Sequence, residues 1–289
     1  MKLVVKFNLV FAIVFFIGMV GAGYVSHTIL EKNAREETLE NASLIMEAAM
    51  AARRYTEDAV APLLRRLTDE EFLPPTVPAF AATEQFNALH ARFPDFAYKE
   101  ATLNPTNLRD RATDWETDIV DRFRQFHEAE ISGERDTPNG RSQYLARPIR
   151  IQDPACLQCH STVEAAPKPL VRRYGPANGF GWKLDEVVGA QIVSVPTVHA
   201  EKRAERAFHT FMLAFALLFV AVFALLNVLV HVLVVAPVTR LARAADEVSL
   251  GKIEAADFPT PGRDEVSLLA HSFNRMKKSL IRAIKMLEQ

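Results

Sequence analysis

Apolar residues are concentrated in two long runs that carry no charged side chain. Residues 7–30 and residues 207–239 contain no Asp, Glu, Lys or Arg. About 20 apolar residues are enough for a helix to cross the hydrocarbon core of a bilayer, and a helix without a polar face is not typical of a soluble protein. The pattern predicts two transmembrane helices, over 7–30 and 208–235.

Basic residues flank these two runs. Lysines precede the first run within residues 1–6, and arginines follow the second near the start of residues 236–289. Because such residues mark the cytoplasmic side, we expect both ends in the cytoplasm and residues 31–206 outside, which in a bacterium is the periplasm at the inner membrane. A cleaved signal peptide is the alternative for the first run, since Gly21 lies in a stretch of small residues. The length of the run favours a retained anchor.

Residues 31–206 are too long for a connector and mix helical and strand patterns. Apolar residues have helical spacing over 32–72, 83–92 and 111–130, and strand patterns occupy 142–151 and 187–195. Pro62 is expected to bend or end the first helical stretch. The apolar positions of that stretch are Leu44, Ala48, Ala52, Tyr55 and Ala59. Strands interspersed with helices predict an α+β domain.

The segment after the second run has a heptad pattern. It predicts two short helices, separated at Gly251, in which the apolar residues step by three and four. The first set is Val238, Leu241, Ala245 and Val248, and the second is Val266, Leu269, Phe273, Met276, Leu280, Ala283 and Leu287. We expect a helical coiled coil over residues 236–289.

The composition narrows the class of protein. The 34 basic and 35 acidic side chains give a net charge of −1, which argues against a surface that binds nucleic acid. The chain has 2 cysteines. This number excludes a disulfide-stapled scaffold and any metal site that needs four thiolates.

The two cysteines form the motif that carries chemistry. Cys156, Cys159 and His160 have the spacing C-x-x-C-H, which is the attachment signature of c-type haem. Two thiols at this spacing can reach the two vinyl groups on one edge of a porphyrin, and the adjacent imidazole can then ligate the iron. We predict one covalent haem c, attached at Cys156 and Cys159, with His160 as the proximal ligand.

Two other interpretations of the motif remain. A thioredoxin-like disulfide pair accounts for the two cysteines but leaves His160 without a role. A zinc site would need a fourth ligand from an isolated histidine elsewhere in the chain. Haem c is attached outside the cytoplasmic membrane, which agrees with the topology predicted from the two apolar runs.

The sixth iron position could be empty, hold water or be filled by a neutral side chain. Methionine and histidine are the usual choices. Met46 and Met50 lie one helical turn apart on a predicted helix, so that both point to a similar face. Either is a candidate for the distal ligand, and His90, His127 and His199 are further alternatives.

The haem pocket needs basic and aromatic side chains. Haem propionates pair with arginine or lysine, and Arg53, Lys99 and Arg147 are candidate partners. Large aromatic side chains form apolar walls. Phe180 and Trp182, which lie among glycines that permit close backbone approach, are candidates for that role.

Several short segments, in order along the chain, resemble one protein family. They are YKEAT (98–102), NPTN (104–107), WE (115–116), ARPI (146–149), CLQCH (156–160), YG (174–175), NGFGW (178–182) and GAQ (189–191). Together they resemble the bacterial c-type-haem sensor domains with a PAS-like fold, long catalogued as a domain of unknown function. The resemblance implies one haem c on a small antiparallel sheet flanked by helices, in a protein that feeds signalling. The sixth ligand varies among members, and a cysteine used by some has no counterpart here.

The C-terminal segment resembles a second family. Pro237 directly after the second run, the acidic pair Asp264-Glu265 and the segment FNRM (273–276) are similar to a HAMP linker. HAMP linkers are parallel four-helix bundles made by two subunits, so the resemblance implies a homodimer through the HAMP and transmembrane helices. An ordinary amphipathic tail is the alternative.

These features predict a membrane-anchored receptor. A periplasmic haem c would sense redox state or a diatomic ligand and relay the change through the second span to the HAMP segment. Because no kinase or chemoreceptor pattern follows the heptads before residue 289, we expect a separate cytoplasmic signalling partner. A membrane-tethered monohaem cytochrome for electron transfer is the alternative. We do not expect an enzyme, since no distal His–Arg pair can be placed near the iron from sequence.

Overall fold

The structure is a computed structural model that describes residues 3–68, 71–138, 140–252, 257–258, 262 and 264–287. The predicted cytoplasmic residues 1–2 and the predicted HAMP residues 288–289 lie outside this set. The chain divides into two compact units, one formed by residues 1–27 with 208–289 and the other by residues 28–207. Each unit is described by itself below.

The centre of the unit formed by residues 28–207 is a four-stranded antiparallel sheet. Its strands are β1 (Ala97–Thr102), β2 (Ile131–Thr137), β3 (Gly140–Arg150) and β4 (Val187–Pro196), in the spatial order β1-β4-β3-β2. The sequence predicted only the two central strands, β3 and β4, which are the most apolar. The predicted α+β class is confirmed.

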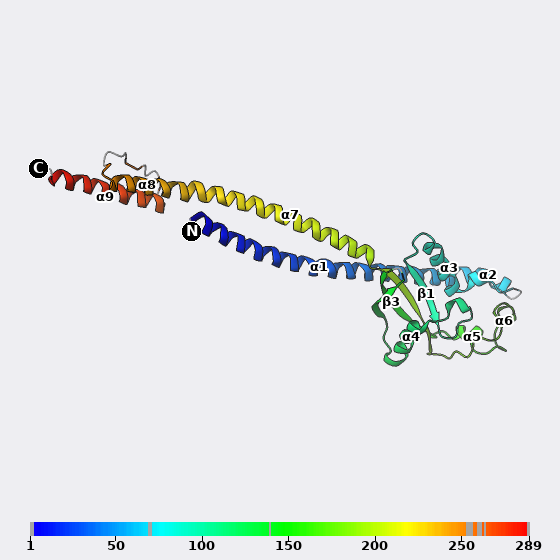
Figure 1. Ribbon diagram of the computed structural model, residues 1–289. Coiled ribbons are helices and arrows are strands. Elements are labelled where there is room, and N and C mark those ends of the chain that lie inside the picture. The colour runs from blue at the N-terminus through cyan, green and yellow to red at the C-terminus, as the bar shows by residue number, and fades with distance from the viewer. Residues whose placement is uncertain are drawn as a thin grey trace. The chain divides into compact units, whose positions relative to one another are not determined.

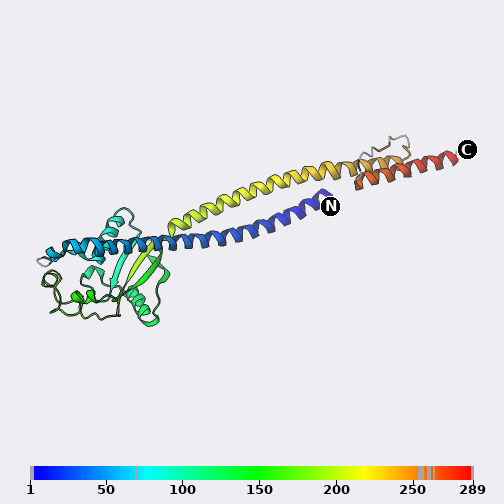
Figure 2. The same ribbon diagram turned by 180° about the vertical axis from the view of Figure 1, so that it is seen from behind.

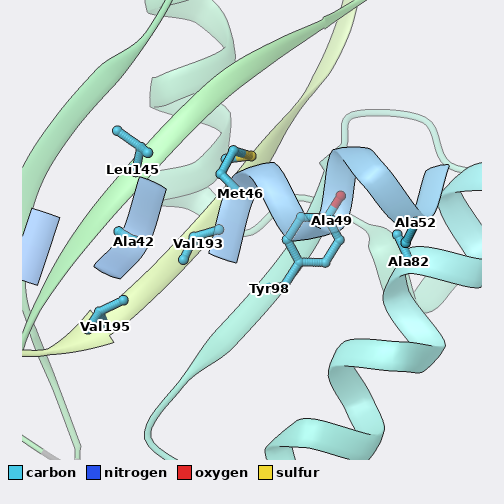
Figure 3. Close-up of a cluster of buried hydrophobic side chains, with 9 residues drawn as sticks. All are labelled: Ala42, Met46, Ala49, Ala52, Ala82, Tyr98, Leu145, Val193 and Val195. Carbon is cyan, nitrogen blue, oxygen red and sulfur yellow. The ribbon is translucent and has the colours of Figure 1, made fainter. Parts of the chain in front are cut away.

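Helices cover both faces of the sheet (Figures 1 and 2). Helix α1 (Leu3–Tyr55) packs its row of small residues and Met46 against one face, and α4 (Asp114–Phe126) packs Ile119, Val120 and Phe123 against the other. Successive residues of a strand point to opposite faces, so Val193 of β4 faces α1 while Ile192 faces α4. Figure 3 shows the cluster on the α1 side, into which Ala82 of α3 (Pro78–His90) also packs. The core is therefore two apolar layers separated by the sheet.

Short helices occupy the connections of this unit. The connection from β3 to β4 is long and carries three of them, η4, α5 and α6, and it also contains the C-x-x-C-H motif. The short elements are η1 (Thr56–Val60), α2 (Ala61–Thr68), η2 (Pro74–Thr76), α3 (Pro78–His90), η3 (Leu108–Asp110), η4 (Pro154–Cys156), α5 (Leu157–His160) and α6 (Lys168–Tyr174).

The buried face of α1 is not the apolar stripe that the sequence pattern emphasised. Of the predicted positions, Ala52 is buried, whereas Leu44 and Tyr55 are 64% and 65% exposed. The face against the sheet instead carries Ala42, Met46, Ala49 and Ala52 (Figure 3). Small side chains let the helix axis approach the sheet closely, and this packing outweighs the greater hydrophobicity of Leu44 and Tyr55.

Pro62 does not end the first helix. The chain passes from α1 through the π-helical turn η1 directly into α2, and the backbone N–H of Ala61 donates to the carbonyl of Thr56, five residues back. Proline cannot donate, and its ring clashes with the carbonyl four residues earlier in an α-helix. The wider π turn lies where that clash would occur, so the helix accommodates the proline without a break.

The remaining helices lie in the unit formed by residues 1–27 and 208–289, except that the first of them begins ten residues before residue 208. They are α7 (Val198–Val230), the π-helical turn η5 (His231–Val235), α8 (Ala236–Ser249) and α9 (Glu265–Leu287). Two continuous helical stretches, 4–64 and 198–249, are long and apolar enough to cross a membrane, and their most apolar windows are not buried within the chain. Phe15 of the first stretch stacks on Phe219 of the second, with ring centroids 4.8 Å apart. The length and composition of the two helical stretches agree with the two predicted spans.

A buried ion pair joins α1 to β1. The guanidinium of Arg53 donates to both carboxylate oxygens of Glu100, at 2.6 and 2.5 Å, and the hydroxyl of Tyr98 donates to the same carboxylate at 2.8 Å. The Glu100 side chain is only 6% exposed. Its charge is therefore tolerated because three hydrogen bonds replace those with water.

Replacing Arg53 by Met would leave the Glu100 carboxylate buried without its counter-charge. We expect Arg53→Met to lower the free energy of unfolding of residues 28–207 by about 3 kcal/mol. Urea unfolding followed by tryptophan fluorescence measures this, because Trp115 and Trp182, the chain's 2 tryptophans, both lie in this unit. The control Arg122→Met removes an exposed pair with Glu128 and should cost below about 1 kcal/mol. Equal losses would contradict a special role for the buried pair.

Asp110 introduces a pH dependence into the same region. Burial raises the pKa of its carboxyl to about 6, although the adjacent Arg109 charge acts in the opposite direction. Because this pKa lies above the ordinary value of 3.8, folding favours the protonated form. The resulting stabilisation is present at low pH and is lost as the pH rises through about 6.

The amide of the variant Asp110→Asn cannot ionise, so this variant should not lose that stabilisation as the pH rises. Between pH 4 and pH 7 we expect its free energy of unfolding to rise by about 2 kcal/mol relative to that of the wild type. Urea titrations at the two pH values provide the measurement. The control Asp118→Asn, at an exposed position of α4, should follow the wild type at both. A parallel pH profile for Asp110→Asn would show that this carboxyl does not carry the effect.

Candidate functional site

The C-x-x-C-H motif lies on two short consecutive turns. The side chain of Asp153 accepts a hydrogen bond from the Ala155 amide at 2.8 Å and thereby starts the 3₁₀ turn η4, which passes directly into α5. Cys156 closes η4, while Cys159 and His160 close α5. Both cysteines are free thiols and are half-buried. Local turn chemistry thus brings the two sulfurs and the imidazole into one small segment.

His160 is held in one orientation by the loop that precedes β4. Its Nδ1 lies 2.7 Å from the carbonyl oxygen of Gly179, and its ring stacks on Trp182 with centroids 3.9 Å apart and planes 11° apart. A carbonyl can only accept, so Nδ1 carries the proton and Nε2 keeps its lone pair. Within the described chain Nε2 has no hydrogen-bond partner. His160 therefore has the tautomer and the free nitrogen of a metal ligand.

The same loop is joined to the motif by backbone hydrogen bonds. The Gly181 amide donates to the Ser161 carbonyl at 2.8 Å, and the Trp182 amide donates to the His160 carbonyl at 3.1 Å. Together with the imidazole bond to Gly179, these contacts fix residues 179–182 against the end of α5. The imidazole is thus positioned by a rigid loop and not by its own short helix alone.

A third segment, directly after β1, fixes this loop in turn. The Asn104 side chain donates to the Phe180 carbonyl at 3.1 Å and accepts from the Gly179 amide at 3.2 Å. Gly179 has φ +85°, and a Cβ placed on it would lie 2.8 Å from the backbone Cα of Thr106. The hydroxyl oxygen of Thr106 is buried and without a hydrogen-bond partner in the described chain. Gly179 is thus enclosed on both sides.

Burial controls the protonation of the motif. It raises the pKa of both Cys156 and Cys159, so that both are neutral thiols at neutral pH. It lowers the pKa of His160, an effect that the hydrogen bond to Gly179 opposes only in part. The imidazole is therefore neutral at neutral pH, which is the form that can bind a metal.

Charged groups of α1 and η1 act on the first cysteine. Burial and the charge of Asp153 are the main causes that raise the pKa of Cys156; the charge of Glu57 raises this pKa further, whereas a backbone hydrogen bond and the charge of Arg53 lower it. Met50 lies one turn before Arg53 and is half-buried, whereas Met46 is fully buried in the cluster between α1 and the sheet (Figure 3). Met50 is therefore the more accessible of the two candidate distal ligands.

The three candidate propionate partners all have carboxylate partners in the chain. Lys99 donates to Glu116 at 2.7 Å on the α4 face of the sheet, opposite to Arg53. Arg147 bridges Glu47 of α1 at 2.6 Å and Glu130 at 2.8 Å. The structure therefore does not bring these basic side chains together into one cluster.

The two aromatic candidates lie at the motif, but in different roles. Trp182 stacks directly on His160, as described above, and is half-buried. Phe180 is also half-buried, and its carbonyl is the group that Asn104 holds. In the sequence, Asn104 and Thr106 are distinguished only as members of the segment NPTN (104–107). The two bonds of Asn104 to a loop 75 residues away have no local signal in the sequence.

Among the described residues, no group of three or more His, Cys, Asp and Glu side chains is arranged to hold a metal ion. Two histidines outside the motif, His90 and His127, have structural roles elsewhere in the domain. His90 donates from Nδ1 to the Phe96 carbonyl at 2.9 Å, and His127 follows the last residue of α4 with φ +54°.

A model of the Tll0287-like family matches residues 31–196. The chain belongs to the Tll0287-like family. A HAMP domain matches residues 229–282. The predicted resemblance to a haem PAS-like sensor followed by a HAMP linker is thereby confirmed. A Tll0287-like domain joined to a HAMP domain, together with two apolar helices, indicates a membrane signal transducer.

The crystal structure of the cyanobacterial heme-protein Tll0287 is similar at 18% sequence identity and a TM-score of 0.41, covering 55% of this chain and 95% of that one. No curated protein matches.

The enclosure of Gly179 can be tested against its neighbour in the same loop. Gly179 and Gly181 have φ +85° and +83°, but a Cβ on Gly181 meets nothing within 4 Å. We expect Gly181→Ala to cost about 1 kcal/mol, for backbone strain alone, and Gly179→Ala about 3 kcal/mol, since Thr106 must also move. Urea unfolding of the two variants measures the difference. Similar losses would mean that Thr106 yields without cost.

Proposed function

We propose that this chain is a receptor of the bacterial inner membrane that carries one covalent c-type haem on its periplasmic domain and relays the state of that haem to its HAMP domain. Residues 7–30 and 208–235 are the two spans, residues 31–206 the haem domain, and residues 1–6 and 236–289 the cytoplasmic parts. The stimulus is the redox state of the iron or a diatomic ligand.

The geometry of His160 carries this proposal. Its Nδ1–H bond to the Gly179 carbonyl at 2.7 Å leaves the lone pair of Nε2 free to bind a metal. Two free thiols lie in the same short segment. A thioredoxin-like pair needs no such imidazole. The residues present therefore fit a c-type haem: Cys156 and Cys159 would hold the ring as thioethers and His160 would ligate the iron. When bound, the haem would supply an iron that changes charge on reduction and can take a further ligand.

The chain's own residues would complete the pocket. Trp182 keeps the His160 ring in plane and shields one of its faces. Met50 or Met46 would supply the distal ligand, and the partial exposure of Met50 favours it. Arg53, Lys99 and Arg147 would contact propionates only by sharing or exchanging their present carboxylate partners. Among the three, Arg53 is the one whose charge acts on Cys156.

The HAMP segment supports both relay and dimer. Within one chain, α9 buries Ala270 and Lys277, while the predicted heptad residues Leu269, Met276 and Leu280 are 52%, 59% and 42% exposed. An apolar seam left uncovered in a single chain fits a second copy. We therefore propose a homodimer through the HAMP and transmembrane helices that acts on a separate cytoplasmic signalling partner.

A membrane-tethered monohaem cytochrome for electron transfer is the second candidate. It would use the same Cys156, Cys159 and His160. It has no need for a HAMP domain, and the match over residues 229–282 therefore favours the receptor. The domains present are not of an enzymatic kind, and we propose no catalytic activity.

The test begins with covalent haem in the full-length chain, produced in a bacterium that matures c-type cytochromes. We expect a reduced pyridine haemochrome spectrum for the wild type, about tenfold less haem in Cys156→Ala and Cys159→Ala, and retained haem with altered axial ligation in His160→Ala. The control His90→Ala removes another imidazole bonded to a backbone carbonyl and should leave the spectrum unchanged. Absence of covalent haem from the wild type would overturn the proposal.

The same preparation separates receptor from electron carrier. A spin label at Met276→Cys, in the exposed seam of α9, reports the distance between two copies. A receptor should give different distance distributions in the ferric and ferrous states, and His160→Ala should abolish the difference. A distribution that stays the same while a redox partner oxidises the haem rapidly would favour the electron carrier.

A further inference from the structure

The orientation of His160 depends on one carbonyl group, that of Gly179. This carbonyl accepts the Nδ1 proton at 2.7 Å and thereby decides which imidazole nitrogen is free. A peptide in a loop can rotate, and its carbonyl moves with it. The residue that prevents this rotation therefore controls the imidazole without touching it.

Asn104 is the side chain that holds the peptides on either side of that carbonyl. Its Oδ1 accepts from the Gly179 amide, which precedes the carbonyl, and its Nδ2 donates to the Phe180 carbonyl, which follows it. A backbone amide can only donate and a carbonyl can only accept, so the two bonds also fix the orientation of the Asn104 amide. Asn104 thus brackets the Gly179 carbonyl from both sides.

The backbone at Gly179 leaves the loop little room to rearrange. Its φ of +85° and the contact with the Thr106 Cα exclude a side chain at this position. Thr106 and Asn104 belong to the same segment after β1. The segment therefore contacts the Gly179 peptide with a hydrogen-bonding group on one residue and a steric surface on another.

We infer that Asn104 is a positioning residue for the proximal ligand: by fixing the Gly179 carbonyl it selects the His160 tautomer and sets how strongly the imidazole donates to the iron. This inference rests on the proposed function, since it concerns His160 as an iron ligand. A firm Nδ1–H···O bond makes the imidazole a stronger donor. A ligand that donates more electron density stabilises ferric over ferrous iron. The two hydrogen bonds of the Asn104 side chain to residues 179 and 180, which we call the Asn104 clamp, therefore lower the reduction potential.

Asn104→Ala removes both hydrogen bonds, and Asn107→Ala is the matched control. Asn107 lies in the same segment, where its side chain accepts from the Arg109 amide at 3.2 Å, and within the described chain it makes no hydrogen bond to residues 178–182. Asn104→Asp keeps the acceptor for the Gly179 amide and loses the donor to Phe180. It provides a second variant with less disruption, should Asn104→Ala not fold.

Two measurements on the full-length chain in detergent test the inference. In the chain without haem, ¹⁵N spectra of labelled histidine report the tautomer of His160, identified by comparison with His160→Ala. We expect the Nδ1–H form in the wild type and in Asn107→Ala, and a mixture of tautomers in Asn104→Ala. In the haem-loaded chain, we expect a higher midpoint potential in Asn104→Ala than in the wild type. At a given solution potential, the ratio of ferrous to ferric iron should increase about tenfold, which corresponds to a rise of about 59 mV for one electron.

The outcomes are distinct. A rise for Asn104→Ala, a smaller rise for Asn104→Asp and none for Asn107→Ala would support the inference, whereas an unchanged potential in folded Asn104 variants would overturn it. Equal rises in Asn104→Ala and Asn107→Ala would also overturn it, because loosening of the segment would then be the cause. Failure to attach haem in the wild type would refute the proposed function instead, and the tautomer spectra would still show whether the clamp exists.

Discussion

The hydrogen bond from His160 Nδ1 to the Gly179 carbonyl is the contact on which the site depends. Without it, a side chain at the end of a four-residue helix would be free to choose either tautomer and several rotamers. With it, the ring is fixed between Trp182 and a backbone oxygen. The surrounding sheet acts mainly as a support, since β1 and β4 bring the two fixing segments to the motif.

The sheet also explains how polar groups are kept inside the domain. Alternation along β1 sends Glu100 to the α1 face and Lys99 to the α4 face, and each finds an opposite charge on the helix that covers its side. The two ion pairs therefore lie on opposite sides of one strand. Such pairs contribute less to stability than apolar packing of similar size, but they specify which helix lies on which face.

Much of this architecture could be predicted from sequence, and the exceptions have physical causes. The two spans, the motif and the central strands have strong local patterns. Strands β1 and β2 were missed because they are edge strands rich in Lys, Glu, Arg and Asp, which form strands only when a neighbour supplies the hydrogen bonds. The predicted helix over 111–130 ends at Phe126, because His127 adopts a left-handed conformation. The role of Asn104 depends on a contact across 75 residues, and no local pattern encodes it.

The π-helical turns have a mechanical consequence. Each lies just before a proline, η1 before Pro62 and η5 before Pro237, and in each the first residue after the turn donates to a carbonyl five residues back. Hydrogen bonding therefore continues up to the proline, and the helical stretch is continuous on both sides of it. A continuous helix transmits torsion, whereas a kinked joint would absorb it. A rotation of α7 about its own axis would thus reach α8 with its angular phase preserved.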